Sequence, residues 1–161
     1  VRADRPGIRT IDYHTVTGHP LLTAEGKSRS TGNTVVSKRQ YLQDASFLVV
    51  LQAAPDLLEE IRAALQNPKW CIFLGRKSCV PSRPVFDGIH TEYADIKDAI
   101  FRYPPAKRAR FPLAYECPAI STEDINYTRT DAIVSASHRQ FAKRPVQRGV
   151  VKEAANVSEQ N

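Results

Sequence analysis

The stretch that decides the fold is ASFLVVLQAAPDLLEEIRAALQNPKWCIFL, residues 45–74. Its first part, 45–53, is an almost continuous apolar run, which is typical of a strand buried on both faces. Pro55 stands where a helix would begin, and residues 70–74 have the composition of a second buried strand. Between the two strands, apolar residues recur at helical spacing, namely Leu57, Leu58, Ile61, Ala64 and Leu65. Strand, amphipathic helix and strand predict an α+β protein that contains the second half of a ferredoxin-like βαββαβ unit.

A long hairpin is expected before this unit. Residues 8–16, IRTIDYHTV, are rich in β-branched and aromatic types and predict a strand. Residues 17–33 are polar and rich in glycine, as in a long loop, and residues 34–41, TVVSKRQY, are expected to form the returning strand. The tip and the return arm carry the cations Lys27, Arg29, Lys38 and Arg39. A solvated loop with scattered cations would look the same, so this segment alone does not establish a binding site.

Directly after the strand predicted at 70–74, the chain reads LGRKSCVPSRPVF, residues 74–86. Gly75 would let a ligand approach the backbone closely. Arg76 and Lys77 could meet phosphates, and Ser78 could donate a hydrogen bond. Such a site suits a bent single strand of RNA, with Tyr13, Tyr41 and Phe141 as stacking faces.

The sequence pattern that predicts helices and strands is weaker in the C-terminal part of the chain. Residues 91–103, TEYADIKDAIFRY, predict a short helix with Ile96, Ala99 and Ile100 inward, and residues 104–112, PPAKRARFP, predict a basic turn. Short strands are expected around LAYEC at 113–117 and INYTRT at 125–130.

The last basic segment, SHRQFAKRPVQRGVVK at 137–152, is expected to be a basic tail. Its candidate phosphate contacts are Arg139, Lys143, Arg144 and Arg148, although a solvated basic end is the commoner interpretation of such a segment. We expect two parts: residues 1–86, which hold the remaining part of the ferredoxin-like domain and the hairpin at about 8–41, and residues 87–161, which form a β-rich region with the basic tail.

Composition favours a polyanionic partner, because the 161 residues carry a formal net charge of +6. Three cysteines form no CxxC pair, which suits a reduced, cytoplasmic setting. No apolar run is long enough to span a bilayer. No cofactor or metal is expected, because no phosphate-binding glycine motif is present and the histidines at 14, 19, 90 and 138 are scattered.

One catalytic alternative stays open at the sequence level. Metal-independent RNA cleavage needs a base for the 2′-hydroxyl and an acid or a cation near the leaving oxygen. Tyr13, His14 and Lys38 could meet across the hairpin for this purpose. A single histidine in a tyrosine-bearing strand is more often structural, so we expect a binding protein and not an enzyme.

Four segments carry a family resemblance: DYHTV at 12–16, YLQDASF at 41–47, LGRKSCVPSRPVF at 74–86 and RQFAKRPVQRG at 139–149. In this order they resemble the CRISPR-associated Cas five family, specifically its subtype I-E members, which are subunits of the Cascade surveillance complex. The resemblance implies a ferredoxin-like, RNA-recognition-type domain with a protruding thumb hairpin, followed by a smaller β-rich part.

The same resemblance implies a function in antiviral defence. Members hold the 5′ handle of the crRNA at one end of Cascade, contact the backbone subunit CasC and the large subunit CasA, and meet target DNA through the complex. In subtype I-E another subunit, CasE, cuts the precursor, which implies a non-catalytic cap. A subtype I-C relative does cut repeat RNA with Tyr, Lys and His, and this keeps the nuclease alternative open.

Residue roles follow from the resemblance. Arg76, Lys77 and Ser78 would bind the handle. His14, Lys38 and Arg39 would guide the RNA strand toward the first CasC subunit. The C-terminal cations Arg139, Lys143, Arg144 and Arg148 would add phosphate contacts.

The chain departs from the family at its start. Members begin with a βαβ segment, whereas this sequence begins just before the thumb. We therefore expect apolar sheet surface to be exposed unless another segment or partner covers it.

Overall fold

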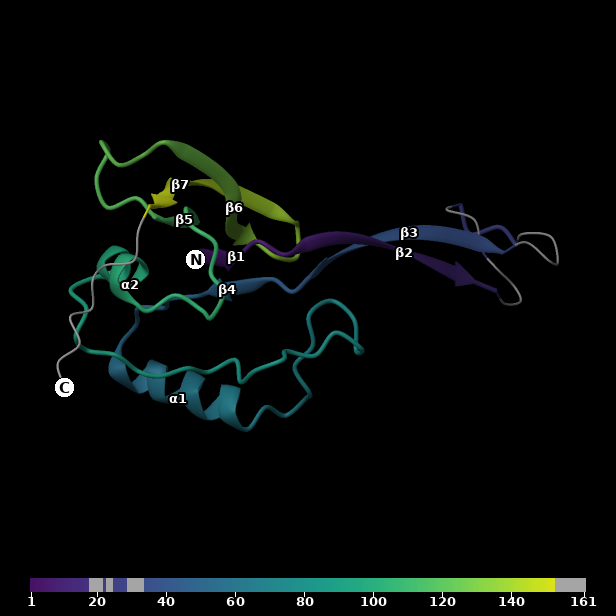
Figure 1. The fold of residues 1–161 in the computed structure, drawn as a ribbon. Coiled ribbons are helices and arrows are strands. Elements are labelled where there is room, and N and C mark those ends of the chain that lie inside the picture. Colours follow the sequence, from purple (N-terminus) through teal and green to yellow (C-terminus); the bar gives the residue numbers. More distant parts are fainter. Residues whose placement is uncertain (18–21, 23–24, 29–33, 153–161) are drawn as a thin grey trace.

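The computed structural model describes residues 1–17, 22, 25–28 and 34–152. A curled antiparallel sheet of five strands carries a two-stranded hairpin that projects away from it (Figure 1). The strand order of the sheet is β4-β1-β5-β7-β6, with β1 at Arg2–Arg5, β4 at Ser46–Leu48, β5 at Leu113–Pro118, β6 at Tyr127–Ser135 and β7 at Gln140–Val151. The α+β class is therefore confirmed, and the sheet with few helices is compatible with a ferredoxin-like fold.

The projecting hairpin, called the thumb below, consists of β2 at Ile8–Val16 and β3 at Val35–Gln43. Its strands pair in continuous register from Ile8 opposite Gln43 to Val16 opposite Val35. This confirms the strand predicted over 8–16 and the returning strand predicted over 34–41. Arg29 and most of the loop predicted over 17–33 lie outside the described residues.

Gly7 sets the base of the thumb, where β1 passes into β2. Its φ is +78°, a left-handed backbone conformation that residues with a Cβ atom rarely adopt. A Cβ on Gly7 would lie 2.8 Å from the backbone oxygen of Gln43 and 2.8 Å from the Cβ of Ala45. Glycine therefore allows the two strands of the thumb to approach closely where they leave the sheet.

Helix α1, at Pro55–Gln66, confirms the helix predicted from apolar spacing. Pro55 occupies the first turn, where its missing N–H costs no hydrogen bond, and Asn67 caps the C-terminal end. The apolar stripe of α1 is only partly covered: Leu58, Ile61 and Leu65 are half-buried, and Leu57 is exposed.

The two strands predicted beside α1 are largely wrong. Of the apolar run at 45–53, only Ser46–Leu48 forms a strand, and residues 70–74 form none. Strand β4 pairs with β1, and in the described part of the chain no other strand lies beside it. A buried strand needs neighbours that cover its faces and take its hydrogen bonds. Most of these apolar residues therefore stay exposed, as Trp70 does at 78% exposure. Most of the exposed residues lie outside the sheet, so the expectation of exposed apolar sheet surface stays a prediction.

The core lies between the sheet and α2, at Ile96–Arg102. Ala99 and Ile100 of this helix are buried, as predicted, and Phe101 packs edge-on against Tyr115 of β5 at 5.1 Å between ring centroids. Ile96 is only half-buried. The helix thus covers the face of the sheet that β5 presents to it.

A buried ion pair fixes α2 to the first strand. Arg2 and Asp4 of β1 are 1% and 3% exposed, and the Arg2 Nε atom lies 2.6 Å from Asp4 Oδ1. The Arg2 guanidinium also donates to the carbonyls of Ile100, Tyr103 and Pro104 at the end of α2. Helix ends leave carbonyls without partners in the helix, so Arg2 satisfies groups that burial would otherwise leave unpaired.

The expected basic tail is part of the sheet. Residues 140–151 form β7, the longest strand, which pairs with β5 on one side and β6 on the other. The strands predicted around 113–117 and 125–130 correspond to β5 and β6. One sheet therefore combines β1 and β4 with strands from beyond residue 86, and the division into two parts stays a prediction.

Candidate nucleic-acid interface

The loop at residues 74–79 is a tight turn beside the thumb. The backbone N–H of Leu74 donates to the oxygen of Cys79 at 2.7 Å, and the N–H of Cys79 donates to the oxygen of Arg76 at 2.9 Å. Gly75 has a φ of +84°, and nothing lies within 4 Å of where its Cβ would be. The loop therefore keeps an open, left-handed position at which a ligand can approach the backbone.

Arg76 turns back from this loop onto the thumb. Its guanidinium lies 2.5 Å from Asp12 Oδ2 and 3.2 Å from His14 Nδ1, and it stands over the ring of Tyr41 at 5.2 Å from the centroid. The side chains of Arg76 and Asp12 are 31% and 41% exposed. Arg76 thus joins the 74–79 loop to both strands of the thumb.

Lys77 and Ser78 form the exposed tip of the loop. Neither side chain has a partner among the residues that the structure describes, in contrast to Arg76. Their charge and hydrogen-bonding capacity are therefore available to a ligand. Of the four predicted loop residues, Gly75, Lys77 and Ser78 keep free surface and Arg76 is engaged.

The two faces of the thumb carry different groups, because neighbouring residues of a strand point to opposite sides. Asp12 and His14 lie on the side that Arg76 contacts. Tyr13 lies on the other side, directly opposite Lys38 in the register, and the Lys38 Nζ atom stands 5.5 Å from the centroid of the Tyr13 ring. Tyr13 is 64% exposed, which leaves its ring open for stacking.

This geometry does not assemble the catalytic alternative. Tyr13 and Lys38 share a face of the thumb, whereas His14 points away from them and holds Arg76. The three groups therefore do not converge on one reacting phosphate in this arrangement. Arg39, on the face of Asp12, is exposed and donates from Nε to the hydroxyl of Ser37 at 3.3 Å.

The C-terminal candidates divide into neutralised and free cations. Arg144 makes two hydrogen bonds to Asp131, at 3.0 and 2.8 Å, and these lower the pKa of that carboxyl. Lys143 and Arg139 are exposed, and Arg139 has a left-handed φ of +51° in the turn before β7. Neither has an ion pair within the described ranges. Arg144 therefore serves the sheet, while Lys143 and Arg139 remain open to anions.

Arg148 belongs to a second ion-pair cluster on the sheet. Glu116 accepts hydrogen bonds from Arg129 at 2.7 Å and from Arg148 at 2.7 Å, and the bond from Arg129 is the main reason that its pKa falls to about 2. Arg148 also lies over the ring of Tyr127 at 3.4 Å from the centroid. The carboxylate joins β5 to β6 and β7, so this cluster stabilises the sheet.

Sequence reasoning missed the acidic partners of these cations. Asp12, Asp131 and Glu116 each neutralise an arginine that the sequence suggested for phosphate binding. The spacing of Asp131 and Arg144 on either side of a short turn was the available signal, because opposite charges at that separation can face each other across a hairpin. Asp12 gave no such signal, since Arg76 reaches it from a distant loop.

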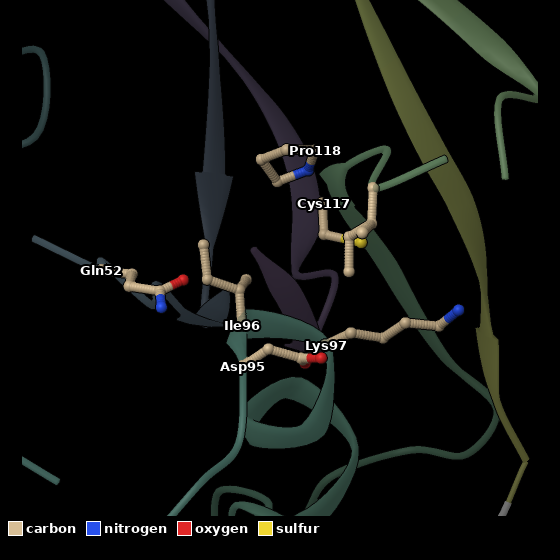
Figure 2. Close-up of a pocket in the computed structure, with 7 residues that line it drawn as sticks. Gln52, Asp95, Ile96, Lys97, Cys117 and Pro118 are labelled. Carbon is tan, nitrogen blue, oxygen red and sulfur yellow. The ribbon is translucent and has the colours of Figure 1, made fainter. Parts of the chain in front are cut away.

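The described residues contain no group of three or more His, Cys, Asp or Glu side chains that could hold a metal, and none of their helices could cross a membrane. A pocket of about 160 Å³ lies between the start of α2 and the end of β5 (Figure 2). It is lined by Gln52, Asp95, Ile96, Lys97, Cys117, Pro118 and Ile120.

This pocket lies away from the thumb. The partner of Tyr115 in the register is Arg2, so the end of β5 at Cys117 and Pro118 extends past the start of β1, whereas the thumb follows the end of β1. The pocket therefore does not belong to the surface formed by the 74–79 loop and the thumb.

Comparisons with known proteins agree with one another. The family described as "CRISPR-associated protein (Cas_Cas5)" matches residues 1–147. The CRISPR system Cascade subunit CasD of Escherichia coli (strain K12) is 30% identical over 146 residues, which cover 89% of this chain and 61% of that protein. A chain of a solved CRISPR RNA-guided surveillance complex has a TM-score of 0.61 at 22% identity, over 94% of this chain and 66% of that chain. This chain therefore spans less than two thirds of the length of either relative.

Proposed function

Because the chain belongs to the CRISPR-associated Cas five family, we propose that it binds crRNA as a subunit of a Cascade-type surveillance complex. The observation that carries this proposal is the exposed tip of the 74–79 loop, where Lys77 and Ser78 have no partner among the described residues and stand beside the thumb. A cation and a hydroxyl next to an open glycine match the chemistry of an RNA phosphate.

The 5′ handle of the crRNA is the part of the RNA that we assign to this surface. Lys77 and Ser78 contact a phosphate, and Gly75 lets the RNA backbone come close. Tyr13 offers an exposed ring on which a base can stack, with Lys38 beside it. Arg39, Arg139 and Lys143 add exposed charge along the path of the strand.

Arg76, His14 and Arg144 have a different part in this proposal. Arg76 and His14 hold the 74–79 loop against the thumb, and Arg144 is neutralised by Asp131. They shape the surface, and any contact they make with RNA requires that an existing partner be displaced.

The proposed partners follow from the family. We propose that the thumb reaches the backbone subunit CasC, that the large subunit CasA lies beside the chain, and that target DNA is met through the assembled complex in the cytoplasm. We propose a non-catalytic role, supported by the opposite directions of Tyr13 and His14 on the thumb.

A single binding experiment tests this function. The full protein is titrated with labelled repeat RNA without metal, and each sample is also run on a denaturing gel. Wild type should bind with a log–log salt slope of roughly −2 to −4, as expected for about three to five phosphate contacts on a single strand. The RNA should stay intact.

Lys77→Ala should weaken binding by about tenfold, because a hydrogen bond to a charged group contributes about 1.5–3 kcal/mol. The matched control is Lys69→Ala, which removes an exposed lysine just after α1 that has no ion pair in the described part of the chain. Binding that does not depend on salt, or equal losses in both variants, would contradict the proposal. Discrete cleavage that disappears in His14→Ala would favour the nuclease.

A further inference from the structure

The turn at residues 104–112 concentrates charge that the fold does not neutralise. Lys107, Arg108 and Arg110 are all exposed, and none has an ion pair among the residues described by the structure. No acidic residue occurs between Asp98 and Glu116. On strands β6 and β7 the arginines Arg129, Arg144 and Arg148 are each paired with a carboxylate, whereas the cations of this turn remain unbalanced.

The turn is held rigidly in spite of its exposed side chains. The backbone N–H of Ala106 donates to Asp4 Oδ2 at 2.7 Å, and the N–H of Arg110 donates to the backbone oxygen of Asp4 at 3.1 Å. A further bond, from Ala109 N–H to the oxygen of Ala106 at 2.9 Å, closes the turn. Asp4 is itself buried and paired with Arg2. The backbone is therefore fixed from inside, which reduces the entropy lost when the outward cations bind an anion.

A cation from a distant part of the sequence comes to the same place. Val151 at the end of β7 is paired with Leu113, the first residue after the turn. Lys152 follows Val151 and is exposed, so the register brings it to the end of the turn. Two segments that are far apart in the chain thus contribute positive charge at the same end of the neighbouring strands β5 and β7.

An aromatic side chain accompanies these cations. Phe111 is adjacent to Arg110 and is 41% exposed. Proteins that bind single-stranded nucleic acids combine cations, which pair with the phosphates, with exposed aromatic rings, on which the bases stack. This turn offers both. An acidic protein surface would need the cations but would make no such use of the ring.

We propose that Lys107, Arg108, Arg110 and Lys152 form a second phosphate-binding surface, which holds the backbone of a single nucleic acid strand apart from the 74–79 loop. The proposal rests on the nucleic-acid function assigned above and adds a second contact surface to it. The strand is either a continuation of the bound RNA or a separate DNA strand, since both carry the same phosphodiester backbone.

The test uses the full protein and the double variant Lys107→Gln with Arg110→Gln. Arg108 is left unchanged because its φ of +62° makes substitution there ambiguous. The control is Arg62→Gln with Lys69→Gln, which removes the same amount of positive charge, one residue from α1 and one from the segment just after it. The melting curve of Lys107→Gln with Arg110→Gln should match wild type, because the bonds that hold the turn come from the backbone. The control loses the Arg62–Glu59 ion pair, but that pair is exposed, so its melting curve should change little.

Affinity is measured for a labelled 24-nucleotide repeat RNA between about 0.1 and 1 M salt. Each phosphate contact on a single strand contributes about 0.7 to the slope, so losing two should reduce it by about 1.4 and weaken binding about 25-fold at 0.1 M salt. A second titration adds a labelled 24-nucleotide single-stranded DNA to protein already saturated with RNA. A loss confined to the first titration identifies the RNA as the strand, and a loss confined to the second identifies DNA.

Either loss supports the second surface. If the double variant and the control behave alike in both titrations while wild type binds RNA, the second surface is refuted and the function proposed above stands. If wild type shows no salt-dependent binding to RNA, both proposals fail. An acidic polypeptide such as polyglutamate that competes as well as RNA of equal charge would also refute the nucleic-acid assignment of this surface.

Discussion

Arg76 should stabilise the base of the thumb, and replacing it should loosen the thumb before it affects the rest of the sheet. Its guanidinium contacts Asp12, His14 and the ring of Tyr41, which belong to both strands of the thumb. Arg76→Ala removes all of these contacts at once. Lys77→Ala, one residue further along, removes a side chain without a partner in the described residues and is the matched control.

The stability lost in Arg76→Ala can be estimated from how far the Arg76 and Asp12 side chains are exposed. The Arg76 and Asp12 side chains are about one-third and two-fifths exposed, so we place their coupling near the top of the range for exposed ion pairs, at about 1 kcal/mol. The cation–π contact with Tyr41 adds about 0.5–1 kcal/mol. A total of about 1.5 kcal/mol corresponds to an opening equilibrium of the thumb base that is raised roughly tenfold.

Hydrogen exchange followed by mass spectrometry measures this opening. Peptides that cover Ile8–Val16 should exchange about tenfold faster in Arg76→Ala, and peptides from β5 and β7 should be unchanged. Asp12→Asn should raise exchange by a smaller amount, and adding it to Arg76→Ala should have little further effect, because the two residues share one interaction. Unchanged exchange in Arg76→Ala, or strictly additive effects in the double variant, would refute the role of Arg76 as a brace.

Two further predictions concern the sheet. Arg2→Met should reduce the free energy of unfolding by about 3–5 kcal/mol in urea titrations, because the substitution leaves the buried Asp4 carboxylate without its partner. A loss below about 1 kcal/mol would contradict this prediction. The double variant Arg2→Met with Asp4→Asn should recover part of the lost stability, because it also removes the buried charge. The folded-state pKa of Glu116 is about 2, below its usual value of 4.5, so the stability that its ion pairs contribute is complete above pH 4.5 and is lost as the pH falls toward 2. The urea midpoint of wild type should fall over this pH range, and that of Glu116→Gln should not show this loss. Equal acid sensitivity in both proteins would count against the ion-pair cluster.

Local patterns predicted the elements that depend on local physics. Helix α1 was visible because its apolar spacing and Pro55 act within one segment, and the strand at 8–16 was visible because β-branched and aromatic residues recur along it. The apolar runs at 45–53 and 70–74 were misleading. Their composition indicates burial, yet burial requires covering neighbours that a local pattern does not contain, and in the described structure Trp70 and most of these residues remain exposed.

The candidate site shows the same limit. Lys77 and Ser78 were found because they follow a glycine, and the structure leaves them exposed. Arg76, adjacent to them, looked equivalent in the sequence, but Asp12 holds it through a contact between residues 64 positions apart. The C-terminal arginines were likewise read as free charge, whereas strand pairing places Arg144 opposite the β6 segment that carries Asp131. Charge in a sequence identifies candidates, and only the fold shows which charges are already neutralised.

The central claim is that the 74–79 loop and the thumb hold crRNA, and mapping RNA–protein crosslinks in the assembled complex tests it most directly. The complex is irradiated with ultraviolet light, digested, and the crosslinked peptides are identified by mass spectrometry. The account predicts crosslinks to nucleotides of the 5′ handle in the peptides that contain Lys77 with Ser78 and Tyr13 with Lys38. Handle crosslinks that fall only on the peptides of α1 and the Asp95–Lys97 pocket, with none in the loop or the thumb, would contradict it.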